Sequence, residues 1–342
     1  MSPNRVNASL SLPALVCPLC KGKLTSDTEA YGCASCDRSY PILHGIPDFR
    51  LRSDRYLSLD EERAKAERIE QLAAAGFAAQ LNGYYEITAD VPPELARRYK
   101  AYHHNGPASA AHAIAQLQLN QEQVFLDVGC GSGGALLAAA ACSRKLVGVD
   151  IALRWLVICK QRLREAGVQA SLICADAEAL PFPDQCFDQV LASDLLENTY
   201  DVNKTLASLE RVMTPDAHMW VSGSNKYCLG PHPSTRMWAI GFLPRALRSS
   251  LLRRVRGVDS LRFTHLITPL GVRAGCKRLG LLVRGLRTKT LPKPAQEQFQ
   301  NSERLLLNLY RCLSRIPILS YLLLLVGPSF ELHLQKPTKP KS

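Results

Sequence analysis

The sequence predicts an α/β fold, with a doubly wound parallel sheet in which short strands alternate with helices. Apolar runs at residues 124–128, 145–149 and 170–174 each carry or lead into an acidic residue, and a fourth run covers 187–193. A glycine-rich turn at 129–134 follows the first run and opens an Ala/Leu-rich segment. This order is typical of open sheets that bind a nucleotide-like ligand at the carboxyl ends of their strands. Two close pairs of cysteines near the N-terminus predict a second, smaller domain.

The glycine-rich turn is the most informative segment of the chain. Residues 124–134 read Val-Phe-Leu-Asp-Val-Gly-Cys-Gly-Ser-Gly-Gly. Glycine tolerates positive φ and lets a ligand lie against bare backbone, and the helix beginning near Gly133 offers free N–H groups. Gly129, Gly131 and Gly134 match the pattern G-x-G-x-x-G, which by itself does not separate NAD from S-adenosylmethionine (SAM).

Three acidic residues lie in or just after these runs, and two of them, Asp127 and Asp176, separate the two cofactors. Asp150 ends the second run, where a carboxylate would accept hydrogen bonds from ribose hydroxyls in either case. Asp127 precedes the glycines, where it would repel a pyrophosphate but stabilise a sulfonium or an ammonium group. Asp176 follows the third run and could accept a hydrogen bond from an adenine amino group. The sequence therefore favours SAM.

This ordered set of motifs resembles the class I SAM-dependent methyltransferases, in particular the ubiquinone/menaquinone-biosynthesis-like branch (methyltransferase type 11), closely over about residues 105–225. The resemblance implies a seven-stranded Rossmann-like methyltransferase sheet with a helical insertion before the last strand. It also implies that Asp127 and the glycines line the methionine part, that Asp150 holds the ribose and Asp176 the adenine, and that residues 193–196 face the methyl group. The cofactor-binding residues it implies are Asp127, Gly129, Cys130, Gly131, Gly133, Asp150, Ile151, Asp176, Ala177 and Ser193.

The chain departs from this family at two turns and adds aromatic residues before the core. Glu197-Asn198 stands where the family often has Glu-His, and Pro215-Asp216-Ala217 stands where it usually has Pro-Gly-Gly. Related enzymes often close a segment over SAM ahead of the first strand. Here that segment contains Tyr84, Tyr85, Tyr99, Tyr102, His103 and His104. We take ordinary helix packing as the simpler interpretation of these rings.

Cys17, Cys20, Cys33 and Cys36 form two C-x2-C pairs separated by twelve residues. Each pair can direct two thiolates at one ion, so the two pairs predict a tetrahedral zinc site; a cytosolic redox pair is the alternative. Because four cysteines leave no open coordination position, the zinc is predicted to be structural. Residues 15–49 also resemble the zinc-ribbon domain known as a stand-alone activator of methyltransferases.

The size and composition of the chain limit the number and kind of domains that it can form. With 342 residues, 46% hydrophobic and 21% charged, it can hold one large and one small globular domain. We expect a zinc ribbon at 12–50, a helical connector at 51–110, the methyltransferase domain at 111–337 (insertion about 292–328) and a tail at 338–342. The first 16 residues lack the pattern of a signal peptide, so we expect a cytoplasmic protein with reduced cysteines.

Further elements are expected from apolar periodicity. Before the core, residues 54–80 predict one long helix or two short ones. After the fourth run we expect a fifth strand at 217–222, a helical lid at 238–247, a helix at 268–279 and two antiparallel edge strands at 281–289 and 330–335.

The C-terminal half is basic and leucine-rich. Residues 236–315 hold 17 Lys and Arg against three acids, within a chain of net charge +12. RNA, an anionic membrane surface or plain solvent could face this charge. The uninterrupted apolar piece 316–327 is 12 residues long, short of the ~20 that a membrane span needs. It predicts a buried helix, an interfacial helix or the wall of an apolar substrate pocket, and no transmembrane span.

Two residues are candidates for acid–base catalysis. His232 lies in the loop after the fifth strand, and Glu197 follows the fourth. The leading hypothesis is a SAM-dependent methyltransferase that transfers methyl in line from the sulfonium to a small-molecule or lipid-linked acceptor. One alternative is a ribosomal or transfer RNA methyltransferase that holds RNA with the ribbon and the basic half. Another is a non-catalytic SAM-binding partner module.

Overall fold

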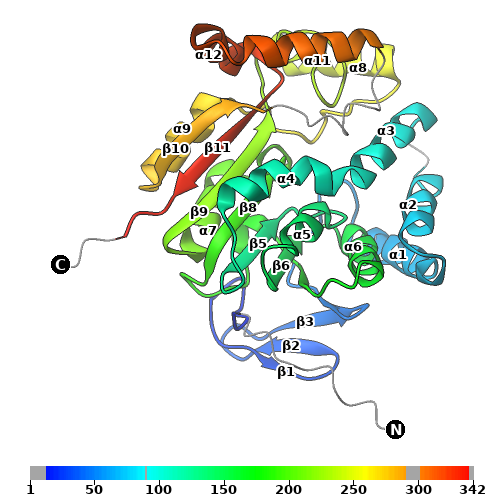
Figure 1. Cartoon of the computed structure of the whole chain (residues 1–342). Coiled ribbons are helices and arrows are strands. Elements are labelled where there is room, and N and C mark those ends of the chain that lie inside the picture. The colour runs from blue at the N-terminus through cyan, green and yellow to red at the C-terminus, as the bar shows by residue number, and fades with distance from the viewer. Residues whose placement is uncertain (1–12, 89–90, 290–300, 339–342) are drawn as a thin grey trace.

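The computed structural model describes residues 13–88, 91–289 and 301–338. Residues 12, 292–300 and 339–342, which the expected domain limits include, lie outside the described residues. A seven-stranded sheet forms the centre, in the order β10-β11-β9-β8-β5-β6-β7 (Figure 1). The strands are Val124–Val128 (β5), Lys145–Asp150 (β6), Ser171–Cys174 (β7), Phe187–Ser193 (β8), Met213–Ser224 (β9), Leu282–Thr288 (β10) and Ser329–Gln335 (β11). The prediction of a doubly wound seven-stranded sheet is confirmed.

The direction of each strand fixes where a site can form. Strands β5 to β9 pair in parallel, so their carboxyl ends share one edge of the sheet. Strand β11 runs antiparallel between β9 and β10, as expected for the two last strands. Since β10 is antiparallel to β11, it runs in the same direction as the parallel strands and also ends at their carboxyl edge.

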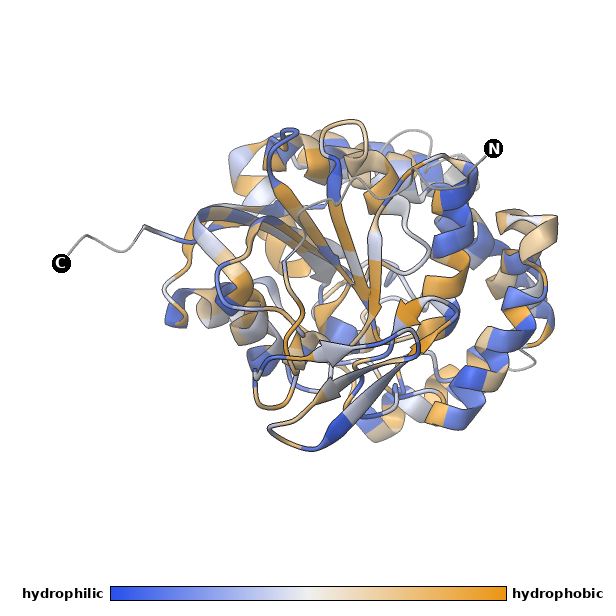
Figure 2. Cartoon of the chain, turned by 90° about the horizontal axis from the view of Figure 1, so that it is seen from below, coloured by the Kyte–Doolittle hydropathy of each residue, from blue (hydrophilic) through white to orange (hydrophobic). Residues whose placement is uncertain are grey.

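Helices cover both faces of the sheet. They are α4 (Gly106–Leu117), α5 (Gly134–Ala139) and α6 (Leu153–Glu165) on one face, and α7 (Val202–Val212) and α9 (Pro269–Arg278) on the other. Neighbouring residues of a strand enter different cores: Phe125 packs with Leu191 and Trp220, while Leu126 packs with Val190. Because both faces are covered, the central strands are nearly continuous hydrophobic runs (Figure 2).

The N-terminal strands form a separate antiparallel sheet, made of β1 (Thr25–Ser26), β2 (Ala30–Cys33), β3 (Arg38–Leu43) and β4 (Ile46–Pro47). The chain leaving β4 runs beside edge strand β7, where the Phe49 N–H donates to the Cys174 carbonyl at 2.7 Å. Phe49 is buried against the rings of Tyr31 and Tyr40. This small sheet therefore covers the edge of the central one.

Three helices connect the two sheets: α1 (Leu59–Glu70), α2 (Phe77–Glu86) and α3 (Pro93–His104). Residues 54–80 thus form two short helices rather than one long one. Gly76 separates them with a φ of 94°, and the Glu165 carboxylate accepts from the Phe77 N–H at 2.7 Å. This backbone conformation is one that residues with a side chain rarely adopt, so glycine is favoured there.

The C-terminal part adds α8 (Arg245–Arg256), α11 (Asn301–Leu313) and α12 (Pro317–Val326). The expectation of a helix over 238–247 is wrong. A short 3₁₀ turn covers Ile240–Phe242, and α8 begins only after Pro244, because the residue before a proline is pushed to extended backbone. Among the described residues, no helix is long and apolar enough to cross a membrane.

Candidate functional site

The glycine loop joins β5 to α5 at the carboxyl edge of the sheet. Gly129, Gly131 and Gly133 all have positive φ, between 49° and 79°. A Cβ on Gly133 would lie 2.5 Å from the Cys159 sulfur of α6, so this position accepts no side chain. The Gly129 N–H donates to the Val149 carbonyl at 2.7 Å and ties the loop to β6. The loop therefore exposes bare backbone next to the ends of two strands.

Asp127 and Asp150 lie on either side of this loop. Asp127 is 3% exposed, and burial together with the Asp150 charge raises its pKa to about 8. The Asp150 carboxylate accepts from the N–H groups of Gly131 and Ala152, both at 2.9 Å. Burial also raises the pKa of Asp150. Asp150 thus holds the loop in shape while each of its oxygens keeps a second lone pair for a ligand.

Asp176 follows β7 and already has partners from the connector. Its carboxylate accepts from the Leu51 N–H and from Arg52 Nε, both at 3.0 Å. The Arg52 guanidinium also pairs with Glu178 and lies 4.1 Å from the ring centre of Tyr200. Sequence reasoning missed Arg52, because nothing in its local pattern shows that the chain behind the ribbon returns to the end of β7.

The end of α3 covers the glycine loop from another side. His103 Nδ1 lies 3.0 Å from the Ser132 hydroxyl, and the His103 ring stacks on Trp155 with centroids 4.3 Å apart. Burial and Arg162 lower the pKa of His103 to about 3, so the ring is neutral. The aromatic residues of this region pack on one another as expected, and they also bring His103 to the loop.

The ends of β8 and β9 carry the remaining polar groups of this edge. The Lys289 ammonium donates to the Asp194 carboxylate at 2.9 Å and to the Ser222 hydroxyl at 3.1 Å. Ser222 in turn lies 3.3 Å from the hydroxyl of Ser193. Although burial disfavours its charge, the Asp194 carboxylate raises the pKa of Lys289. Sequence reasoning missed Lys289, which lies 95 residues from Asp194.

Glu197, one of the two acid–base candidates, lies directly behind this group. One oxygen accepts from the Ser224 N–H at 3.1 Å, and the other is buried and has no hydrogen-bond partner among the described residues. Burial and the Asp194 charge raise the pKa of Glu197 to about 7. A carboxylate with a free lone pair and a near-neutral pKa is suited to accept a proton.

His232 lies within its own loop. Its Nδ1 accepts from the Ser234 N–H at 3.3 Å, and its Nε2 is buried and has no hydrogen-bond partner in the part of the chain that the structure describes. Burial and Arg248 of α8 lower its pKa to about 4, so the ring is neutral. The described contacts of His232 join it to this loop rather than to the carboxylates at the strand ends.

The four cysteines of the small sheet meet as expected for a metal site. Their sulfur atoms all lie within 4.8 Å of one another, with 3.5 Å between Cys17 and Cys36 and between Cys20 and Cys33. Tetrahedral zinc with bonds of about 2.3 Å places its sulfurs about 3.8 Å apart. The cluster therefore has the composition and the size for one zinc ion.

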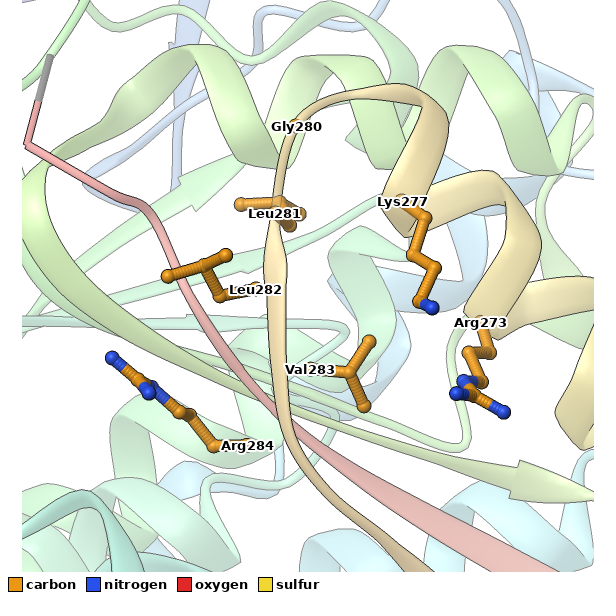
Figure 3. A pocket seen from close by; sticks show the side chains of 7 residues that line it. All are labelled: Arg273, Lys277, Gly280, Leu281, Leu282, Val283 and Arg284. Carbon is orange, nitrogen blue, oxygen red and sulfur yellow. The ribbon is translucent and has the colours of Figure 1, made fainter.

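Two surface hollows lie away from the glycine loop. One, of about 520 Å³, is lined by Arg273, Lys277 and Arg284 and by residues 280–283. Figure 3 shows Arg273 and Lys277 on one side of β10 and Arg284 on the other. This is the start of β10, whereas its end reaches Asp194. The other hollow lies at α1, between Leu57 and Arg68, and includes Thr88. Neither hollow includes a cofactor candidate; at the site itself, Arg52 contacts Asp176 and His103 of α3 contacts the glycine loop.

Comparisons with known proteins find a methyltransferase domain in this part of the chain. Residues 126–221 match the model of a family described as "Methyltransferase domain". The sterol 4-C-methyltransferase strm-1 of Caenorhabditis elegans is 31% identical over 30% of this chain and 32% of its own length. The demethylmenaquinone methyltransferase of Thermus thermophilus is 35% identical over 28% of this chain and 45% of its own length.

Among solved structures, the geranyl diphosphate C-methyltransferase of Streptomyces coelicolor A3(2) is similar, with a TM-score of 0.47 and 13% identity over 70% of this chain and 83% of that one. The chain spans between a third and a half of the length of the two curated relatives. The matched segment contains the end of β5, the glycine loop, Asp150, Asp176 and Glu197. Residues 126–221 of this chain therefore match a methyltransferase domain.

Proposed function

We propose that this chain is a SAM-dependent methyltransferase whose acceptor is a small molecule or a lipid-linked molecule. The observation that carries the proposal is the meeting of Asp127, Asp150 and Asp176 at the carboxyl ends of three adjacent parallel strands. The glycine loop leaves bare backbone beside them. This set suits a ligand with positive charge at one end and ribose and adenine at the other.

Each carboxylate has its own part in cofactor binding. Asp127 would face the ammonium and sulfonium charges, Asp150 would accept from the ribose hydroxyls and Asp176 from the adenine amino group. The backbone and side chains that would line the rest of the cofactor are Gly129, Cys130, Gly131, Gly133, Ile151, Ala177 and Ser193. Bound SAM would supply a methyl group that is already electrophilic, so the protein mainly needs to align the acceptor in line with it.

Glu197 is the preferred general base on the acceptor side. Its unpartnered oxygen can take a proton from a hydroxyl or from an activated carbon acid once the pH exceeds its pKa of about 7. The same strand ends carry Ser193 and the pair of Asp194 and Lys289. His232, the first candidate from the sequence, becomes the second here because its contacts attach it to another loop.

The proposed acceptor class rests on two lines of support. The relatives named above are a sterol 4-C-methyltransferase and a demethylmenaquinone methyltransferase, and both names describe apolar acceptors. An exposed leucine-rich surface on α11 and α12 also suits an apolar molecule better than RNA. A cytoplasmic location of the protein at a membrane surface stays a prediction. The domain limits given above also stay predictions.

RNA is the second candidate acceptor because of the basic residues between 236 and 315. Binding of RNA through phosphate contacts would weaken steeply with added salt, in proportion to the number of phosphates contacted. A fluorescence titration of labelled ribosomal RNA at several salt concentrations distinguishes this candidate from a lipid-linked acceptor.

Calorimetric titration with SAM and with NAD tests the cofactor. SAM should bind and NAD should not. Asp150→Ala should weaken SAM binding about 10- to 150-fold, because a charge-assisted hydrogen bond contributes about 1.5–3 kcal/mol. Tight NAD binding without SAM binding would refute the proposal. Incubation with radiolabelled SAM and a fractionated cell extract then identifies the acceptor.

We also propose that Cys17, Cys20, Cys33 and Cys36 hold one structural zinc ion. The distances between their sulfur atoms and the absence of a fifth ligand position in a four-thiolate site support this role. Metal analysis of protein purified without a chelator should find one zinc per chain.

A further inference from the structure

The two helices α11 and α12 form an exposed apolar hairpin. On α11, Leu305 is 71% exposed and Leu309, one turn later, 53%. On α12, Ile318 is 76% exposed and Leu322, again one turn later, 51%. Residues four apart lie on one face of a helix, so each helix presents a stripe of large apolar side chains to the outside. Single exposed leucines are common, but such a continuous set marks an interaction surface.

The opposite side of the hairpin is firmly attached to the core. Asn225 donates from its side-chain amide to the carbonyls of Leu325 at 2.8 Å and Gly327 at 3.1 Å, and the Leu229 N–H donates to the Val326 carbonyl at 2.9 Å. Leu324 is the buried residue of α12, at 7% exposure. In Figure 1 both helices run along the top of the molecule, with no described element above them. The apolar stripes are therefore held in place and uncovered.

The charge around these stripes is mainly positive. The two helices and the turn between them, residues 301–326, contain Arg304, Arg311 and Arg315 against one acidic residue, Glu303. A second copy of the chain docked on this face would bring these arginines against their own equivalents. Anionic lipid headgroups would attract them, while the leucines enter the acyl region beneath. With 13 and 10 residues, the helices are too short to span a bilayer but suited to lie in its surface.

We propose that the α11–α12 hairpin docks this protein on an anionic lipid surface. Exposed rings next to its anchor extend the same surface, since Tyr227 and Phe242 lie with their centroids 5.2 Å apart and both are exposed. The anchor residue Asn225 directly follows Ser224, whose N–H bonds to Glu197. The core side of the hairpin is thus tied to the end of the strand that contacts the proposed general base. Docking itself does not rest on the proposed methyl transfer.

Co-sedimentation with vesicles tests the docking. The full-length protein should bind vesicles that contain phosphatidylserine and bind pure phosphatidylcholine vesicles more weakly. Ile318→Ser combined with Leu322→Ser should weaken binding by about tenfold or more, because two large side chains lose their transfer into the acyl region. Arg315→Glu should weaken binding to the anionic vesicles by at least about fivefold, and added salt should have the same effect.

Matched variants separate docking from folding. Leu282→Ser removes an exposed leucine at the start of β10, and Arg273→Glu reverses a charge of α9; both should bind vesicles like the parent. Leu324→Ser should lower the melting temperature, whereas the hairpin variants should not. Equal vesicle binding by parent, hairpin variants and controls would overturn the proposal. A parent that is dimeric by analytical ultracentrifugation, with hairpin variants that are monomeric and no vesicle binding, would overturn it in favour of a second copy. These readouts need no SAM, so failure of methyl transfer leaves them interpretable.

Discussion

Asp127 shows how a cofactor site can oppose the stability of the empty protein. Its pKa rises from the ordinary 3.8 to about 8 through burial and the nearby Asp150. Because the folded protein holds this proton more tightly than the unfolded chain does, the raised pKa stabilises the fold. The stabilisation is complete below the ordinary pKa of 3.8 and is lost as the pH rises through about 8. A bound cation would stabilise the Asp127 carboxylate and so offset this loss of stability at higher pH.

Asp127→Asn should therefore stabilise the protein without cofactor and weaken SAM binding. The gain in melting temperature over the parent should be small at about pH 5 and grow until about pH 8, since asparagine does not titrate. SAM binding should fall about tenfold or more, because the cationic end loses its countercharge. Thermal melting across the pH range, with and without SAM, checks both parts. Equal melting of parent and variant at every pH would contradict the first.

Glu197→Gln tests the general base. The amide oxygen can still accept from the Ser224 N–H, so the fold and SAM affinity should be kept. Turnover should fall about 10²- to 10⁴-fold. In the parent, the rate should rise with pH and level off above about 7, where Glu197 loses its proton, and the variant should lack this rise.

Transfer of radiolabelled methyl to the identified acceptor measures both rates over pH. His232→Gln serves as the parallel variant and should keep the pH profile of the parent. Full activity of Glu197→Gln would show that the acceptor needs no base from this residue.

At the scale of elements, the chain between β4 and α1 completes the adenine end of the site. Leu51 and Arg52 bind Asp176, and Arg52 joins it to Glu178. Burial raises the pKa of Asp176, and the guanidinium counteracts part of this rise and orients the carboxylate. An element far from the methyltransferase motifs in sequence thus contributes to their geometry.

Arg52→Ala should weaken SAM binding by up to about tenfold, a modest loss because the Arg52 side chain is partly exposed. Arg52→Lys should recover part of the affinity through its charge. Calorimetric titration of both variants measures the effect. Tighter binding in Arg52→Ala would instead mean that the guanidinium competes with adenine for Asp176.

At the scale of the whole molecule, the cysteine sheet and the central sheet share one hydrophobic core. Cys17, Cys33, Tyr40 and Phe49 pack in the same cluster as the strands of the central sheet. The chain from this sheet continues through Asp48 and Phe49 along β7 to Arg52. Loss of the metal should therefore disturb the contacts that Leu51 and Arg52 make with Asp176 at the adenine end of the site.

Cys33→Ser should lose the zinc and loosen the first 50 residues, while β5, β8 and β9 stay folded. Hydrogen exchange should become faster in β2, β3 and β7 but not in β8. SAM affinity should fall by about the same factor as in Arg52→Ala, because the same contact with Asp176 is disturbed. Cys142→Ser, at a partly buried cysteine outside the cluster, is the control. Retention of zinc by Cys33→Ser would contradict the four-cysteine site.

The sequence by itself determined the parts that depend on neighbours along the chain. Each parallel strand was recognisable from a short apolar run, the glycine loop from its residues and the cysteine cluster from its spacing, and the acids fell at strand ends because that is where such runs stop. Tertiary structure alone decided which distant residues meet: Arg52 with Asp176, and Lys289 with Asp194. It also decided that Leu324 faces the core and Leu322 the outside, because α12 is apolar all round and has no polar face to orient it.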